Sequence, residues 1–312
     1  MRACLMIEGQ EDVTWEDWLA LAQACEEHGL EGLFRSDHYA SVMDDYSRGS
    51  LDAWATIAAL GARTERIRLG SLVSPATFRH PSELAKAVVT ADHVSGGRVE
   101  LGLGAGWHET EHAMFGFPFP ERRVRLERFA EQLEIVHRQW TEETFDFAGL
   151  HYRLEGCRAL PKPVQRPHPP LIVGGRAMRG TVEPAVRWAD EYNTIFASPA
   201  TVRERRAALD EGCERAGRDP ATLPLSLMTI CIVGADEGEV RGRAGRVAAI
   251  RGEAGGGEAF LASQRETGIV GTVEQVRERL AELEAAGVER VFLEHLDHRD
   301  LAMVELVGRE LL

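Results

Sequence analysis

Closely spaced cysteines are absent from this 312-residue sequence. The five cysteines are odd in number, far apart and without a C-x-x-C motif: Cys4, Cys25, Cys157, Cys213 and Cys231. This pattern argues against a disulfide framework and against a cysteine-ligated zinc site. Reduced thiols are typical of cytoplasmic proteins, so we expect a cytoplasmic location.

The sequence also lacks long apolar runs and basic segments. No run approaches the ~20 apolar residues that cross a bilayer. The N-terminal MRACLMIEGQED turns acidic after a few apolar residues, too soon for a signal peptide. The formal net charge of −14 repels phosphate backbones and anionic lipid headgroups. We therefore expect neither a nucleic-acid partner nor a membrane partner.

What the sequence does contain is a repeated alternation of short apolar runs and longer segments with apolar residues at helical spacing. An unbroken β/α alternation predicts parallel strands covered by helices, and eight units close a (β/α)8 TIM barrel. A doubly wound sheet would place a phosphate loop after the first strand, where none is found. We expect one domain over residues 1–312. The predicted strands are Ala3–Ile7, Gly32–Arg35, Ile67–Val73, Val99–Leu103, Leu171–Val173, Tyr192–Phe196, Leu225–Val233 and Arg290–Glu294.

One segment interrupts the alternation before the fifth strand. Thr144–Phe147 and His151–Leu154 flank a short Ala-Gly-Leu turn and predict a small hairpin. The proline-rich PKPVQRPHPP that follows predicts a stiff, extended connector. We interpret residues 141–170 as an insertion into the barrel and not as a separate domain.

The segment GLGAGWHETEH, residues 102–112, resembles a nucleotide-binding loop and a zinc motif at once. A dinucleotide loop requires G-x-G-x-x-G. Counting from Gly102 gives Gly104 and then Trp107, where the third glycine belongs. The segment also follows the fourth predicted strand and not the first. The dinucleotide-loop interpretation therefore fails.

The zinc motif is H-E-x-x-H at residues 108–112, in which two histidines one helical turn apart bind the metal. Glycines before it and Gly116 and Pro118 after it leave barely two turns of helix. A metzincin would carry histidine in place of Pro118. A distant third ligand is still available in Glu131 or Glu134. We rank a zinc peptidase last among the alternatives and expect no metal.

The glycines at positions 102, 104 and 106 have a different use in a barrel. At the C-terminal mouth of a strand, a residue without Cβ lets a flat ligand lie against the backbone. The alternative is purely structural: the glycines allow a tight turn between the strand and the next helix, and Trp107 is a hydrophobic plug beside that turn.

Other strand ends carry further motifs. They are SDH after the second strand, GSLVSPATFRHP after the third, GLGAGW after the fourth, GGRAMRG after the fifth and WADEYN before the sixth. Five motifs in this order resemble the luciferase-like monooxygenase superfamily, in particular its branch that uses the deazaflavin coenzyme F420. The resemblance runs from the first strand to at least Asn193, and it implies a (β/α)8 barrel whose C-terminal mouth holds the coenzyme.

The resemblance also implies a set of coenzyme-binding residues. In that family a non-proline cis peptide in the third strand supports the ring, and alignment on Pro75 places it at Ser71–Leu72. The phosphate site matches Gly174 and Gly175, where backbone N–H groups and a helix N-terminus receive an anion. The implied coenzyme-binding residues are Asp37, His38, Ser71, Leu72, Ser74, Gly104, Ala105, Gly106, Trp107, Gly174, Gly175 and Arg176.

Asp37 and His38 match a pair that lies beside the reactive carbon of the ring in deazaflavin enzymes of this kind. A histidine exchanges a proton near neutral pH, which suits alcohol oxidation or protonation of a reduced product. The resemblance therefore makes His38 the proposed catalytic residue, whereas an isolated strand-end histidine is more often structural.

The sequence departs from the sugar-phosphate dehydrogenases of the family at two places. Those enzymes carry a glutamate after the last glycine, where this chain has Trp107, and a tryptophan shortly after the histidine, where this chain reads YASV at residues 39–42. We do not transfer their substrate for that reason. We expect Trp107, His108, Glu109 and His112 to line the substrate pocket.

Together these features predict an F420-dependent oxidoreductase that transfers hydride between the deazaflavin and a small organic substrate. A two-component monooxygenase using FMN is the first alternative, and a non-catalytic flavin-binding protein is the second. The retained Asp37 and His38 argue against the second. Because the family often forms dimers, we expect a homodimer.

Overall fold

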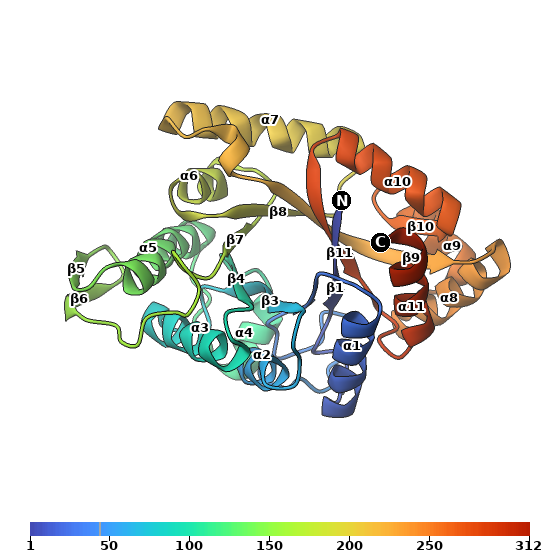
Figure 1. Cartoon of the computed structure of the whole chain (residues 1–312), viewed down its shortest axis with the longest axis horizontal. Coiled ribbons are helices and arrows are strands. Elements are labelled where there is room, and N and C mark those ends of the chain that lie inside the picture. Colours follow the sequence, from blue (N-terminus) through green and yellow to red (C-terminus); the bar gives the residue numbers. More distant parts are fainter. Residues whose placement is uncertain (44) are drawn as a thin grey trace.

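The computed structural model describes residues 1–43 and 45–312, and it confirms the predicted (β/α)8 barrel (Figure 1). All neighbouring strands of the barrel are parallel, and β9 pairs with both β8 and β11, which closes the ring. In ring order the strands are β9 (Leu225–Gly234), β11 (Val288–Glu294), β1 (Arg2–Ile7), β2 (Gly32–Arg35), β3 (Arg68–Pro75), β4 (Val99–Gly104), β7 (Leu171–Gly174) and β8 (Glu191–Ile195).

The predicted strands agree with the observed ones to within two residues at each end, with one addition. The addition is β10 (Ile269–Thr272), which pairs with β9 outside the ring. Its short apolar run lies between two glycines, so it lacks the length by which a strand is recognised in a sequence. The barrel itself is unaffected, because β10 closes no part of the ring.

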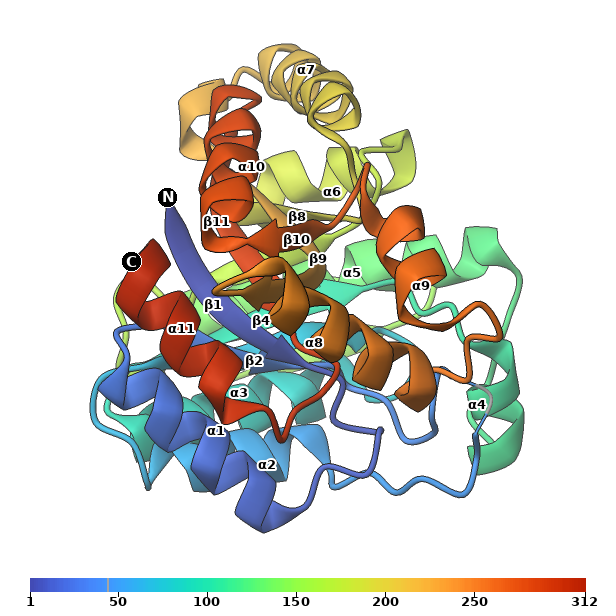
Figure 2. The ribbon, with the colours of Figure 1, turned by 90° about the vertical axis from the view of Figure 1, so that its right-hand side faces the viewer.

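Helices cover the outside of the barrel (Figures 1 and 2). Local sequence starts two of them: Thr14 and Asp17 form a capping box, and Pro81 occupies the first turn after its cap. Within the described residues, no helix is long and apolar enough to cross a membrane. The helices are α1 (Trp15–Glu27), α2 (Ala53–Gly61), α3 (Pro81–Ser95), α4 (Glu109–Phe115), α5 (Arg122–Thr141), α6 (Arg179–Trp188), α7 (Pro199–Ala216), α8 (Glu237–Ile250), α9 (Gly256–Gln264), α10 (Val273–Ala285) and α11 (Leu301–Leu311), with a 3₁₀ turn at Pro220–Thr222.

The predicted hairpin is present between α5 and β7 as a separate antiparallel pair, β5 (Phe145–Ala148) and β6 (Arg153–Cys157). Figure 1 shows it beside α5, away from α8 and α9. The carboxylate of Glu131 accepts hydrogen bonds from three consecutive backbone N–H groups of the turn, at residues 150 to 152. One side chain of α5 thus fixes the turn of the hairpin.

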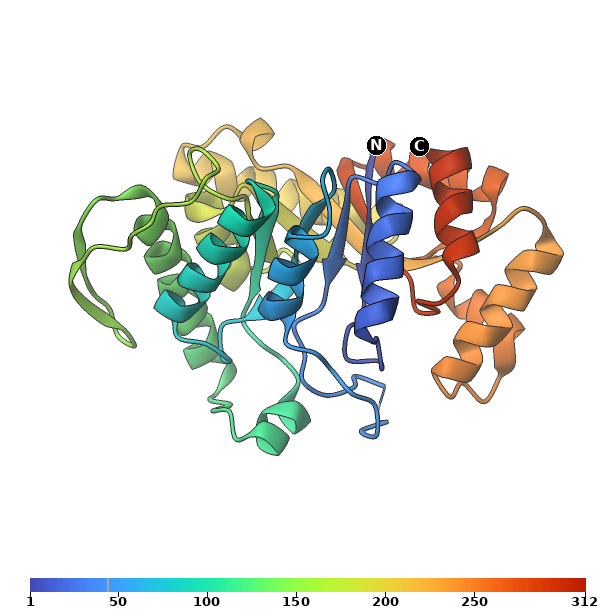
Figure 3. The ribbon, with the colours of Figure 1, turned by 60° about the horizontal axis from the view of Figure 1, so that its bottom comes forward.

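The inside of the barrel is apolar in its middle and ionic toward the start of its strands. The apolar residues that pack inside are Cys4, Met6, Phe34, Leu72, Ile172, Met228 and Phe292. Arg290 of β11 is buried and contacts Glu100 of β4 at 2.7 Å and Glu191 of β8 at 2.8 Å. Figure 3 places both chain termini at one end of the barrel and α4 at the other. The C-terminal ends of the strands therefore form the mouth on the side of α4.

Candidate active site

A cavity of about 800 Å³ opens at the mouth of the barrel. This volume is typical of sites that enclose a cofactor-sized organic molecule. The ends of β1, β2, β3, β4, β7, β8, β9 and β11 all contribute to its wall. Of the predicted site residues, it is lined by His38, Leu72, Gly104, Ala105, Gly106, Trp107, His108, His112, Gly174, Gly175 and Arg176, but not by Asp37, Ser71, Ser74 or Glu109.

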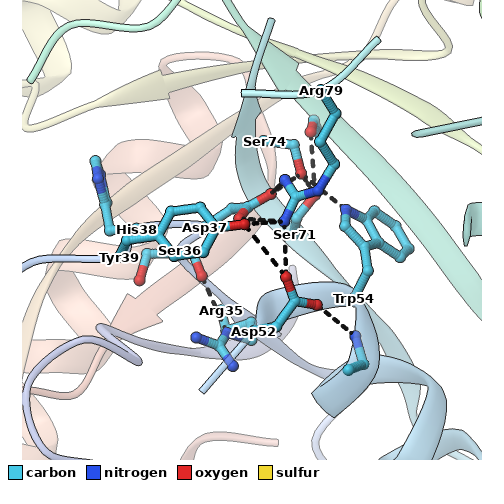
Figure 4. Close-up of polar contacts among 12 residues, drawn as sticks. Arg35, Ser36, Asp37, His38, Tyr39, Asp52, Trp54, Ser71, Ser74 and Arg79 are labelled. Atoms are coloured by element: carbon cyan, nitrogen blue, oxygen red, sulfur yellow. Dashed lines mark hydrogen bonds and ion pairs between the residues drawn. The ribbon is translucent and has the colours of Figure 1, made fainter. Parts of the chain in front are cut away.

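Asp37 lies behind the cavity wall in a buried polar network (Figure 4). Arg79 donates two hydrogen bonds to its carboxylate, at 2.6 and 3.1 Å, and Ser74 Oγ donates a third at 2.6 Å. Trp54 Nε1 donates to Ser74 Oγ at 3.0 Å, and Ser71 Oγ lies 3.0 Å from Ser74 Oγ. In the described structure these residues tie the end of β2 to β3. Side chains alternate along a strand end, so His38 points into the cavity and its neighbour Asp37 points away.

The end of β3 bulges into the cavity at Leu72 and Val73. Ser71 is still paired with Leu101 of β4, but the next pairing joins Ser74 to Leu103, so Leu72 and Val73 together face the single residue Gly102. The non-proline cis peptide lies between these two residues, at Leu72–Val73. The predicted position, Ser71–Leu72, is one residue too early, because Ser71 keeps its regular pairing.

The glycines of β4 and β7 make room for the side chain of Val73. A Cβ on Gly104 would lie 2.7 Å from Val73 Cγ2, and a Cβ on Gly174 would lie 3.0 Å from Val73 Cγ1. A Cβ on Gly102 would lie 2.8 Å from Val73 Cγ1 and even closer to the backbone oxygen of Ser71. At these positions the protein's own atoms fill the space beside each glycine, whereas the prediction was that Gly102, Gly104 and Gly106 let a flat ligand lie against the backbone. Gly106 differs because its φ of +82° is a left-handed conformation that favours glycine.

His38 is held on the cavity wall by Glu111, a residue that the sequence analysis missed. Its Nδ1 lies 2.8 Å from Glu111 Oε2, and the other carboxylate oxygen accepts the backbone N–H groups of Tyr39 and Ala40. Burial alone would lower the pKa of His38, but the hydrogen bond and charge of Glu111 outweigh it and raise this pKa. The pKa of Glu111 is lowered, because its bonds to His38 and the backbone outweigh burial. The pair therefore favours a protonated imidazole facing the cavity.

Glu109 is exposed and does not line the cavity, in contrast to the prediction. It is the first residue of α4, whereas positions 108, 111 and 112 share the face of that helix that is turned to the barrel. A search for an acid one helical turn after His108 would have found Glu111.

His112 uses both ring nitrogens inside the protein. Nδ1 lies 2.7 Å from the carbonyl oxygen of His108, and Nε2 lies 2.7 Å from Thr77 Oγ1. Burial lowers the pKa of His112, so Nδ1 donates to the carbonyl and Nε2 accepts from the hydroxyl. Across residues 1–43 and 45–312, no three histidine, cysteine or acidic side chains are grouped for a metal. Nothing in this geometry supports the zinc alternative.

The end of β7 presents a cationic corner of the cavity. Arg176 is exposed at the cavity wall, and no side chain of the described residues caps the first turn of α6. The N–H of Gly175, predicted to bind an anion, instead donates to the carbonyl of Asn193 at 2.9 Å, because β7 and β8 are still paired at this point. An anion at this corner would therefore meet Arg176 and the start of α6, and not the N–H of Gly175.

The comparison with known proteins agrees with this architecture. Residues 4–290, which are most of the chain, match the protein family described as luciferase-like monooxygenase. The chain belongs to the luciferase-like monooxygenase family. This luciferase-like protein is 34% identical over 203 residues to an F420-dependent glucose-6-phosphate dehydrogenase of Nakamurella multipartita, covering 64% of this chain and 58% of that protein. It is 28% identical over 317 residues to an FMNH2-dependent dimethylsulfone monooxygenase of Pseudomonas putida, covering 94% and 85%.

Among solved structures, an F420-dependent secondary alcohol dehydrogenase in complex with an F420–acetone adduct matches with a TM-score of 0.83. It covers 99% of this chain and 97% of that chain at 19% identity, which shows the shared fold alone. The luciferase-like protein spans less than two thirds of the length of several curated relatives that it matches.

Proposed function

We propose that this protein is an F420-dependent oxidoreductase that transfers hydride between the deazaflavin and a small organic substrate. The observation that carries the proposal is the His38–Glu111 pair on the wall of a cavity large enough for a tricyclic ring. The coenzyme supplies the hydride chemistry when it is bound. His38 holds a proton close to the cavity, which suits protonation of a reduced product.

The walls of the cavity fit such a coenzyme. The side chains of Leu72 and Val73 form an apolar bulge against which a flat ring packs, and Gly106 and Trp107 follow on the neighbouring strand end. Arg176 and the first turn of α6 would attract the phosphate of a bound coenzyme. The homologues named for F420 support this choice of coenzyme.

The FMN-dependent relative supports the alternative of a two-component monooxygenase, because it matches over most of the chain. Both coenzymes combine a flat tricyclic ring with a phosphate. Trp107 stands where the sugar-phosphate dehydrogenases carry a glutamate, so their substrate does not enter the proposal. The proposal includes the predicted homodimer, which light scattering on the purified protein tests.

The test is a pair of fluorescence titrations, one with oxidised F420 and one with FMN. We expect F420 to bind at least about tenfold more tightly, a difference of ~1.4 kcal/mol. Tight FMN binding without F420 binding would establish the alternative coenzyme, and binding of neither would overturn the proposal.

A matched pair of variants probes the cationic corner in the same titration. Arg176→Gln should weaken F420 binding several-fold, because it removes a charge at the cavity wall. Arg153→Gln is the control, since Arg153 lies on β6 outside the cavity, is 75% exposed and pairs with Glu155 at 2.9 Å. Equal losses in both variants would place the phosphate elsewhere.

A further inference from the structure

Phe196, the residue that follows β8, lies at the mouth of the barrel in a strained backbone conformation. Its φ is +44°, in the left-handed region that a bulky aromatic residue rarely adopts and that costs free energy. Its N–H donates to the carbonyl of Met228 at 3.0 Å, and the preceding carbonyl, that of Ile195, accepts from Arg205 at 2.9 Å. The phenyl ring is nevertheless 38% exposed and lines the cavity. A strained residue that is held in place with its side chain exposed is typical of ligand-binding sites.

The cavity wall next to this ring is apolar. Ile195 of β8 pairs with Met228 of β9, and both pack with Leu72 and Val73 of the β3 bulge. All four side chains line the cavity, and none of them carries a charge, a nitrogen or an oxygen. A charged or strongly polar group placed against them would lose its water without gaining a hydrogen bond. The cavity therefore favours an apolar group on the side of β8 and β9.

Trp107 exposes a second aromatic ring in the same cavity, after the end of β4. It is 63% exposed, whereas the other five tryptophans, at positions 15, 18, 54, 140 and 188, are buried or half-buried. The centroid of its ring lies 5.7 Å from that of His38, with the two rings at 79°, and 5.0 Å from that of His108. An apolar ligand that covers Trp107 would thus lie beside the imidazole proposed to hold the proton.

We propose that Trp107 and Phe196 are specificity-determining residues, which bind an uncharged aromatic or alicyclic ring of the substrate beside His38. Such a ring would remove the exposed indole and phenyl surfaces from water and make aromatic contacts with them. The fixed backbone at Phe196 holds its ring in place before the ligand arrives, which limits the entropy lost on binding. The inference rests on the proposed function for the identity of this ligand as the substrate. It narrows that substrate from small organic molecules to those with an uncharged apolar ring.

The test measures the binding of three probes of similar size to coenzyme-free protein, through the NMR shifts of the Ile195 and Met228 methyl groups, which line the cavity. Benzyl alcohol carries an apolar ring without charge, benzoate adds a negative charge to that ring, and xylose offers a neutral but polar ring. We expect benzyl alcohol to bind at least about fivefold more tightly than either of the others. Absence of benzyl alcohol binding, or benzoate or xylose binding as tightly, would overturn the proposal.

Two variants test the aromatic residues directly. Trp107→Ala and Phe196→Asn should each weaken benzyl alcohol binding about fivefold. Asparagine adopts the left-handed conformation more readily than phenylalanine, so Phe196→Asn should not lower the urea midpoint of unfolding. Phe196→Tyr keeps the ring and should retain the affinity. Leu150→Ala is the control, since Leu150 is 81% exposed on the hairpin turn outside the cavity.

A purely structural role of Phe196 would give the opposite pattern. Phe196→Asn would then unfold at lower urea concentration and bind benzyl alcohol with unchanged affinity, and this result would overturn the proposal. Unchanged affinity in Trp107→Ala would remove Trp107 from the substrate site in the same way.

The same titrations in protein saturated with oxidised F420 separate substrate from coenzyme. We expect benzyl alcohol to bind the coenzyme complex as well, whereas loss of its binding there would assign both rings to the coenzyme and overturn the inference. Failure of F420 to bind, with selective benzyl alcohol binding intact, would defeat the proposed function and leave the apolar-ring site standing. Normal F420 binding without probe selectivity would defeat the apolar-ring site alone.

Discussion

Glu111 Oε2 lies 2.8 Å from His38 Nδ1 although the two residues are 73 positions apart in the chain. The side chain of Glu111 is fully buried, and its second oxygen accepts two backbone N–H groups just after His38. One carboxylate of α4 therefore fixes the orientation of the imidazole and the backbone that carries it. This arrangement leaves Nε2 of His38 as the atom available to exchange a proton in the cavity.

Replacing Glu111 by glutamine should move the titration of His38 to lower pH. The pKa of His38 is raised only because Glu111 outweighs burial, and the variant leaves burial to dominate. A step that needs protonated His38 should then lose rate at lower pH than in the native enzyme. The pH dependence of kcat/KM, with the NMR titration of the His38 ring, checks this, and an unchanged titration would contradict the assignment.

The same pair makes a contribution to stability with a defined pH window. A raised histidine pKa stabilises the fold fully below the unfolded-state value of ~6.5, and this contribution is lost as pH rises through the folded-state pKa. The lowered pKa of Glu111 contributes stability that is lost as pH falls through its folded-state value. Glu109→Gln, which alters an exposed acid of the same helix, is the control for the Glu111→Gln variant.

Replacing His38 by alanine should depress turnover while coenzyme binding persists. General acid–base groups typically contribute ~10²- to 10⁴-fold to the rate. The apolar bulge and Arg176 do not depend on this side chain, so the dissociation constant of the coenzyme should change little. Steady-state kinetics and a coenzyme titration on the same preparation measure the two effects. Native-like turnover in His38→Ala would remove His38 from the mechanism.

Gly104→Ala should destabilise the barrel, and Val73→Ala should rescue it. The added Cβ would lie 2.7 Å from Val73 Cγ2, an overpacking that typically costs ~1–3 kcal/mol. Shortening Val73 opens that space, so the double variant should lose less than the sum of the single ones. Denaturant unfolding of all four proteins measures this coupling.

Gly242→Ala is the matched control for the glycine experiment. Gly242 lies inside α8 with open space around its Cβ position. Alanine there should stabilise the protein by up to ~1 kcal/mol through helix propensity. Additive costs for Gly104→Ala and Val73→Ala would show that the glycine serves another purpose than making room for valine.

Arg290→Met should be strongly destabilising at neutral pH. Arg290 is buried between Glu100 and Glu191, and removing it leaves Glu191 buried without a cation and Glu100 with Arg68 alone. Breaking a buried ion pair in this way typically costs ~3–5 kcal/mol. Burial already raises the pKa of Glu191 against the opposing charge of Arg290. In the variant Glu191 should hold its proton to higher pH than in the unfolded chain, so the loss of stability should shrink as pH falls.

Urea unfolding at several pH values measures this effect, with Arg2→Met as the control. Arg2 is half exposed and forms a surface pair with Glu31, which typically contributes ~0–1 kcal/mol. If the loss of stability in Arg290→Met does not change with pH, lost packing, and not uncompensated charge, causes it.

The barrel and its mouth follow from local properties of the sequence. Apolar runs of strand length, separated by segments of helical period, determine where the parallel strands lie, and parallel strands bring their C-terminal ends to one side. His38, Leu72, Gly106 and Arg176 were predicted to meet there, and all four line one cavity. Each lies within three residues of the C-terminal end of a strand, so position along the chain was enough to place it.

Tertiary structure alone decided which neighbouring side chain faces the cavity and what the others do. Asp37, adjacent to His38, turns away to Arg79, and Glu111 rather than Glu109 faces His38. Glycines that were expected to make room for a ligand make room for the side chain of Val73. The physical reason is that these contacts join residues far apart in sequence. In addition, neighbouring residues at a helix start or strand end point in different directions, so a shift of one position replaces a buried side chain by an exposed one.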